Sequence, residues 1–133
     1  MPKFLVMVNH DNGVTDTSMD EWESAEVTAH MNYYDVLTKE LIENGEQIQF
    51  MALADPRRGR VVRSDGASEP VVTDGVYPES KEALAGFQVL DVESEARAIE
   101  IAALISAVPD PGGVPIQQPA EVREVMFESG GEV

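Results

Sequence analysis

Hydrophobic residues of this chain follow helix-like and strand-like spacings in turn, and these spacings predict its elements. Residues 3–9 form a short apolar run that ends at a turn cluster, which predicts a buried first strand. Apolar side chains then recur every three or four residues, which predicts a helix over residues 19–43. Thr17 or Ser18 is expected to cap this helix, and Asn44-Gly45 is expected to end it.

The remaining pattern predicts further strands, a hairpin and a second helix. Asp65-Gly66 is a typical hairpin turn, and Ser94 is a typical N-cap. In chain order, the expected elements are a strand at 47–53, hairpin arms at 59–63 and 70–73, a strand at 86–92, a helix between Ser94 and Pro109, and a strand at 122–127.

The order of these elements predicts an α+β fold. Without the hairpin, it is the ferredoxin-like βαββαβ unit, in which two helices cover one face of an antiparallel sheet. The other sheet face must also be buried, and two sheets packed face to face would bury it, so we expect a homodimer. We expect one domain over residues 1–128 and a flexible tail at 129–133.

Composition narrows the function classes. The chain has 133 residues, no cysteine, and 25 acidic against 9 basic residues, a formal net charge of −16. This charge argues against nucleic acid, and the lack of thiols excludes thiolate metal sites and cysteine nucleophiles. No stretch approaches the roughly 18 apolar residues that a membrane helix needs, and the N-terminal residues lack signal-peptide features. We therefore expect a cytoplasmic protein without a membrane partner.

Charge is unevenly distributed along the chain. Residues 10–50 hold ten acids and only Lys39 as a base, most of them on the predicted first helix. Four of the nine basic residues are instead the hairpin arginines: Arg57, Arg58, Arg60 and Arg63. These arginines either dock against the protein's own acids or contact a small anionic ligand.

Residues 73–87 have the sequence TDGVYPESKEALAGF. They resemble the DGPFAETKEQLGGF signature of the YCII-related, or DGPF, family. Residues 40–45, ELIENG, are similar to that family's EELRAAG, and residues 121–125, EVREV, to its EVRPV strand. The chain departs from the pattern at Val76-Tyr77 and in its longer segment 108–119.

The resemblance implies a ferredoxin-like chain that assembles into a dimeric α+β barrel with a pocket between sheet and helices. It also implies that His30 occupies the position of the helix histidine of many members. A catalytic His–Asp pair has been proposed for one branch, and some members accompany extracytoplasmic-function sigma factors. Because a fold does not fix chemistry, the resemblance names no substrate.

His30 is the strongest candidate for chemistry. Glu26 precedes it by four residues on the same helix face, so an ion pair with this acid is expected to raise the pKa of His30. A histidine near neutrality that a carboxylate orients is typical equipment for proton transfer. The alternative is a partly exposed helix histidine that is solvated beside acids.

Asp74 has two interpretations. In Asp74-Gly75 it either starts a turn or serves as the carboxylate partner of a histidine. His10, Tyr34 and Tyr77 are candidates to line the pocket. Metal-ligand spacings and nucleotide or cofactor motifs are missing from the sequence, so we expect neither metal nor cofactor.

Two functions follow as hypotheses. The first is a homodimeric pocket protein that performs acid–base chemistry on a small neutral or cationic organic molecule, with His30 as base or acid and Asp74 or Glu26 orienting it. The second is a non-enzymatic accessory or regulatory module that acts through protein contacts. The sequence leaves open whether the protein is an enzyme.

Overall fold

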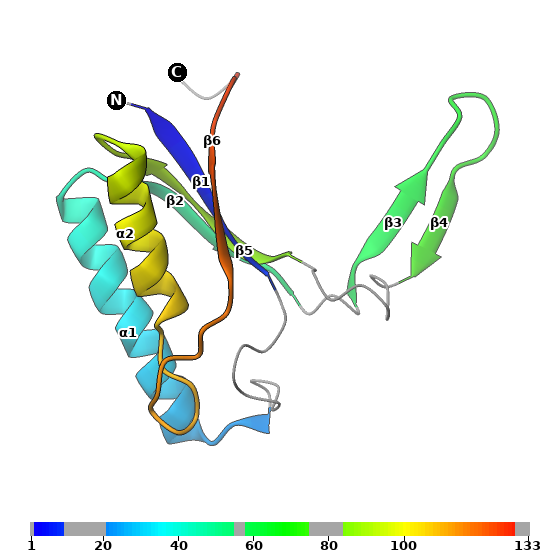
Figure 1. Ribbon diagram of the computed structural model, residues 1–133. Helices are drawn as coiled ribbons and strands as arrows, with labels where there is room; N and C mark the ends of the chain where they lie inside the picture. Colours follow the sequence, from blue (N-terminus) through cyan, green and yellow to red (C-terminus); the bar gives the residue numbers. More distant parts are fainter. Residues whose placement is uncertain (1, 10–20, 55–57, 75–83, 130–133) are drawn as a thin grey trace.

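The computed structural model describes residues 2–9, 21–54, 58–74 and 84–129 (Figure 1). It confirms the α+β class, with two helices and an antiparallel sheet. In chain order the elements are β1 (Lys3–Asn9), α1 (Ser24–Glu43), β2 (Gln47–Ala52), β3 (Arg60–Arg63), β4 (Val71–Asp74), β5 (Leu84–Asp91), α2 (Glu95–Ser106) and β6 (Ala120–Glu124).

Four strands form the main sheet in the order β2-β5-β1-β6, and every neighbouring pair is antiparallel. This is the strand order of the ferredoxin-like unit once β3 and β4 are set aside. Both helices lie on the same side of the sheet (Figure 1). The sheet does not close into a barrel within the described residues, so one chain by itself supplies an open sheet.

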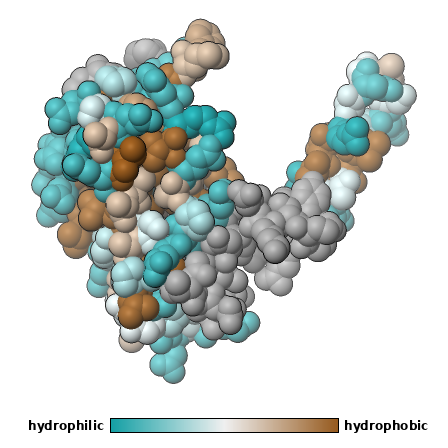
Figure 2. Space-filling view, in the orientation of Figure 1, coloured by the Kyte–Doolittle hydropathy of each residue, from teal (hydrophilic) through white to brown (hydrophobic). Residues whose placement is uncertain are grey.

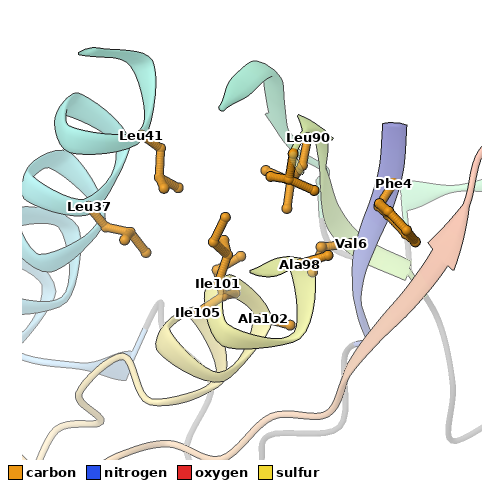
Figure 3. Packing of buried hydrophobic residues seen from close by; sticks show 10 residues of the cluster. Phe4, Val6, Leu37, Leu41, Leu90, Ala98, Ile101, Ala102 and Ile105 are labelled. Atoms are coloured by element: carbon orange, nitrogen blue, oxygen red, sulfur yellow. The ribbon is translucent and has the colours of Figure 1, made fainter. Parts of the chain in front are cut away.

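Alternation along the two central strands positions the core. Phe4 and Val6 of β1 and Leu90 of β5 are buried, whereas the residues between them are only half-buried. The buried set therefore faces the helices. Figure 3 shows Leu37 and Leu41 of α1 pointing toward the α2 residues and the sheet. The cluster consists of Phe4, Val6, Leu37, Leu41, Leu90, Val92, Ala98, Ile101, Ala102 and Ile105.

The ends of α1 show where local sequence signals succeed and where they fail. The helix ends at Glu43 with Asn44 as its C-cap, and Gly45 takes a φ of 73°, as expected from Asn44-Gly45. It begins at Ser24 and not at residue 19, so the predicted start is wrong. Its N-terminus is fixed by Glu26, whose Oε1 accepts a hydrogen bond of 2.8 Å from the backbone N–H of Glu23. Thr17 and Ser18 lie outside the described residues.

Helix α2 begins as predicted. The Ser94 side chain accepts a hydrogen bond from the backbone N–H of Arg97 at 3.2 Å. The Arg97 guanidinium also donates two hydrogen bonds to the carboxylate of Glu46, through Nε at 2.8 Å and Nη2 at 2.9 Å. This bidentate pair joins the first turn of α2 to the residue that precedes β2.

The Pro- and Gly-rich segment after α2 builds a second, smaller core. Val108 and Ile116 are buried there against Trp22, which precedes α1. The backbone N–H of Ile116 donates to the carbonyl of Val108 at 2.8 Å, and the Ser106 hydroxyl donates to the carbonyl of Gln118 at 2.7 Å. Segment 108–119, to which the sequence assigned no role, therefore folds back under the N-terminus of α1.

Strands β3 and β4 form a separate two-stranded sheet that projects from the body (Figure 1). The predicted hairpin and its turn are confirmed: Asp65 accepts hydrogen bonds from the backbone N–H groups of Ala67 and Ser68, and Gly66 has a φ of 81°. Arg60 Nε lies 3.1 Å from Asp74 Oδ1, within the hairpin itself. For Arg60 this agrees with the first alternative, in which the arginines dock against the protein's own acids, although the hairpin lies away from α1 (Figure 1).

Candidate functional site

The candidate site is built around His30, which α1 carries two turns from its start. The side chain is 5% exposed and lies between two aromatic rings. The Trp22 ring meets it edge-on at a centroid distance of 5.2 Å, and the Tyr34 ring at 5.4 Å. Tyr34 in turn stacks on Phe50 of β2 at 5.6 Å. An aromatic row therefore runs from the N-terminal side of α1 to the edge of the sheet.

One nitrogen of His30 is held by the backbone. Nδ1 lies 2.9 Å from the carbonyl oxygen of Pro109. A carbonyl only accepts, so Nδ1 must carry the hydrogen, and neutral His30 keeps its lone pair on Nε2. The second core brings Pro109 to this place, because Val108 is buried immediately before it.

Burial determines the charge state of His30. Desolvation lowers its pKa below the usual value, and this effect exceeds the opposing effect of the hydrogen bond to Pro109. The imidazole is therefore neutral at pH 7, with a fixed tautomer. These properties suit a proton acceptor better than a proton donor.

The expected influence of Glu26 on His30 is wrong. We expected this carboxylate to raise the pKa of His30, but the pKa is lowered. Glu26 caps the helix through the backbone of Glu23. The orienting partner of His30 is the Pro109 carbonyl.

Asp74 is not brought to His30 within one chain. It is the last residue of β4, it is exposed, and it pairs with Arg60. Figure 1 places this hairpin and α1 on opposite sides of the view. The other two pocket candidates, His10 and Tyr77, lie outside the described residues.

Tyr34 is the pocket candidate that lies beside His30. Burial, followed by the neighbouring Tyr33, raises the pKa of Tyr34 to about 12, so its hydroxyl stays protonated at neutral pH. The Tyr33 hydroxyl donates to the carbonyl of Leu104 at 2.6 Å, which joins α1 to α2. The two tyrosines thus differ: Tyr33 connects the helices, and Tyr34 belongs to the aromatic row.

Gln88 is a buried polar residue that is not among the site residues predicted from the sequence. It lies on β5, is 2% exposed, and its Oε1 has no hydrogen-bond partner among the described residues. In register it stands between Val6 of β1 and Phe50 of β2. The signal was present: Gln88 alternates with Leu90, a buried core position of the same strand, so it had to point inward. A buried side-chain amide whose oxygen has no hydrogen-bond partner is unusual. Gln88 therefore places an unpaired acceptor oxygen beside the aromatic row.

The described residues hold no group of three or more His, Asp or Glu side chains arranged to bind a metal ion. Nor does any helix in this part of the chain have the length and apolar character needed to cross a bilayer.

A comparison with curated proteins gives no match. Residues 3–118 match the model of the YCII-related domain, in agreement with the resemblance of residues 73–87 and 40–45. This match covers most of the chain, including both helices, β1, β2 and β5. The protein therefore belongs to the YCII-related domain family.

Proposed function

We propose that this protein binds a small organic molecule beside α1 and that His30 acts on it as a general base. The observation that carries the proposal is the hydrogen bond from His30 Nδ1 to the Pro109 carbonyl. It fixes the ring and its tautomer, so that the lone pair of Nε2 is presented in one direction. A pre-oriented neutral base avoids the cost of reorganisation when the proton moves.

The proposed step is a proton transfer. Nε2 takes a proton from an acidic C–H or O–H bond of the ligand, whose bonding electrons stay on the ligand, and His30 becomes an imidazolium. Return of the proton to another atom of the ligand restores His30 and completes an isomerisation. The Pro109 carbonyl supports the imidazolium, because its hydrogen bond to Nδ1 favours the charged form.

The surroundings of His30 favour a flat ligand that is neutral or cationic. Trp22, Tyr34 and Phe50 offer apolar ring surfaces, and the unpartnered Oε1 of Gln88 offers an acceptor for a ligand N–H or O–H. Acidic side chains at the start of α1, such as Glu21 and Glu23, disfavour an anionic ligand.

The proposal includes a homodimer that forms through the sheet face opposite the helices. On this face Leu5, Met7, Phe87 and Val89 are half-buried, and Met51 is 44% exposed. Packing two such faces together would remove these side chains from water and give the dimeric α+β barrel that the family resemblance implies.

The second candidate is a non-enzymatic accessory or regulatory module, of the kind that accompanies a sigma factor. The same hydrogen bond supports it, because a buried histidine that ties α1 to the segment after α2 has a sufficient structural role. The two candidates differ in what they require of Nε2. The base requires its lone pair, whereas the structural role requires only the donor at Nδ1.

This difference defines the experiment. His30→Asn keeps a donor near Pro109 but removes Nε2, and His30→Ala removes both. A thermal-shift screen of neutral, cationic and anionic small molecules identifies ligands of the wild type, since ligands of the native state raise the midpoint. NMR then follows exchange of ligand protons in D2O.

General-base function predicts that the wild type exchanges a proton of a bound neutral or cationic ligand and that His30→Asn binds the ligand without exchange. Equal exchange by both proteins would refute it. The accessory module predicts that no compound is stabilising and that capture with the wild type and with His30→Asn recovers the same partner protein.

A further inference from the structure

The β3–β4 hairpin is the part of the molecule that the proposed chemistry does not use. We call residues 60–74 the arm. It contains four cross-strand pairs, from Arg60 opposite Asp74 to Arg63 opposite Val71, and it forms a sheet of its own. A two-stranded ribbon is marginally stable by itself in water, so an ordered arm of this length needs a surface to pack on.

The arm has apolar side chains on both faces. Val62 and Val72 stand directly opposite each other, so their side chains lie on one face, and they are 59% and 55% exposed. Val71, which pairs with Arg63, lies on the other face and is 63% exposed. Figure 2 shows apolar surface on the projecting hairpin. Three exposed valines in so short a ribbon are typical of a surface that a partner covers.

Charge indicates the partner. Residues 58–74 carry three arginines and three acids, so this stretch is neutral overall, whereas the chain has a net charge of −16. Its arginines all lie in the first strand or just before it: Arg58, Arg60 and Arg63. Two copies of the body repel each other, but this neutral stretch can approach an acidic copy without net repulsion. Arg60 pairs with Asp74 within the arm, so Arg58 and Arg63 are the arginines that are complementary to the acidic copy.

We infer that the arm is a dimerisation arm, which packs its valines across a second copy of this chain while the second copy's arm packs back. This isologous exchange rests on the homodimer of the proposed function and names the element that holds it together. In chain order the arm stands between two strands of the main sheet. It follows β2, which carries the exposed Met51, and precedes β5, which carries Phe87 and Val89.

The first test weakens the apolar contact without breaking the ribbon. Val62→Thr combined with Val72→Thr keeps two β-branched residues in the strands. Sedimentation equilibrium gives the dimer dissociation constant of this variant, of the wild type and of a control, Val36→Thr, at an exposed valine of α1. We expect a rise of about 10- to 100-fold for the arm variant, because the symmetric interface loses four valines, and little change for the control.

The second test does not depend on the stability of a variant interface. The chain lacks cysteine, so Ala67→Cys at the arm tip accepts one photo-crosslinker at a defined position. Irradiation of the purified protein should give a covalent dimer, with the crosslink in the second copy. The same label at Ala103→Cys, on the exposed side of α2, should give far less dimer.

The possible outcomes distinguish failure of the arm inference from failure of the proposed homodimer. If the wild type dimerises, but the arm variant has the same dissociation constant and Ala67→Cys crosslinks no second copy, the arm inference is wrong and the sheet-face dimer stands. If the wild type is a monomer at all concentrations, both fail. A labelled arm that crosslinks only to another protein in a lysate would also overturn the inference.

Discussion

His30 of α1 donates a hydrogen bond from Nδ1 to the carbonyl oxygen of Pro109, 2.9 Å away and 79 positions later in the chain. The contact joins the two parts of the molecule that form the candidate site: the aromatic row on α1 and the Pro- and Gly-rich segment after α2. The segment after α2 therefore positions the partner of His30, because the buried Val108 and Ile116 hold the Pro109 carbonyl in place.

Substitutions of His30 should destabilise the protein, and a substitution that removes the donor to Pro109 should cost more than one that keeps a donor. We expect His30→Ala to lower the free energy of unfolding by about 2–4 kcal/mol, since it leaves a buried carbonyl unpaired and a cavity among aromatic rings. His30→Asn, which keeps a donor, should lose less. Urea unfolding measures both, with Thr28→Ala on the exposed face of α1 as the control. Equal losses for Ala and Asn would contradict the role of Nδ1.

Stability should depend on pH through His30. Its pKa in the folded protein is lower than the usual value of 6.5, so below pH 6.5 the unfolded chain binds the proton more readily. The contribution of His30 is therefore complete above pH 6.5 and is lost as pH falls below it toward the folded pKa. The difference in unfolding free energy between wild type and His30→Asn, measured from pH 8 to pH 5, should shrink on acidification. His10 and the carboxylates are common to both proteins and cancel. A difference that grows toward acid would mean that the folded pKa is raised.

The second core should be as sensitive as the main core, although it is built from a loop segment. Ile116 is 3% exposed, so Ile116→Ala should cost about 2–4 kcal/mol of unfolding free energy. Val114, two residues earlier, is exposed, and Val114→Ala should cost less than about 0.5 kcal/mol. Denaturant unfolding of the two variants makes the comparison. Similar small losses in both would show that the segment is not packed against Trp22.

The pair between Glu46 and Arg97 should stabilise the fold only while Glu46 is ionised. The hydrogen bonds from Arg97 hold the pKa of Glu46 below its usual value of 4.5. Glu46→Gln should cost about 1 kcal/mol at pH 7, as expected for a well-formed pair at a surface. Because the contribution disappears as pH falls through the folded pKa, the cost should fade below pH 4.5. Parallel unfolding series at pH 7 and pH 3 test this. If Glu46→Gln costs as much unfolding free energy at pH 3 as at pH 7, the cost arises from packing and not from the ionised pair.

Local signals predicted most of the fold. Asn44-Gly45 marked the end of α1, Ser94 marked the start of α2, and Asp65-Gly66 marked the hairpin, because each acts through backbone conformation within a few residues. The start of α1 was missed because two glutamates form its cap, where a Ser or Thr was expected.

The site was predicted less well, for two physical reasons. The spacing of Glu26 and His30 was interpreted as an ion pair, but the helix N-terminus has unpaired N–H groups that compete for the same carboxylate. The true partner of His30 is a backbone carbonyl, which leaves no residue-type signal in a sequence. Gln88 is the exception, since strict alternation along β5 is enough to place its side chain inside.

As a neutral base, His30 carries a proton on Nδ1 and a lone pair on Nε2. Two-bond 1H–15N correlation NMR of the histidine rings at pH 7, with His30→Asn to assign the signals, tests it directly. We expect a pyrrole-type shift for Nδ1 and a pyridine-type shift for Nε2 of His30. Two equivalent imidazolium shifts, or a proton on Nε2 in place of Nδ1, would contradict it.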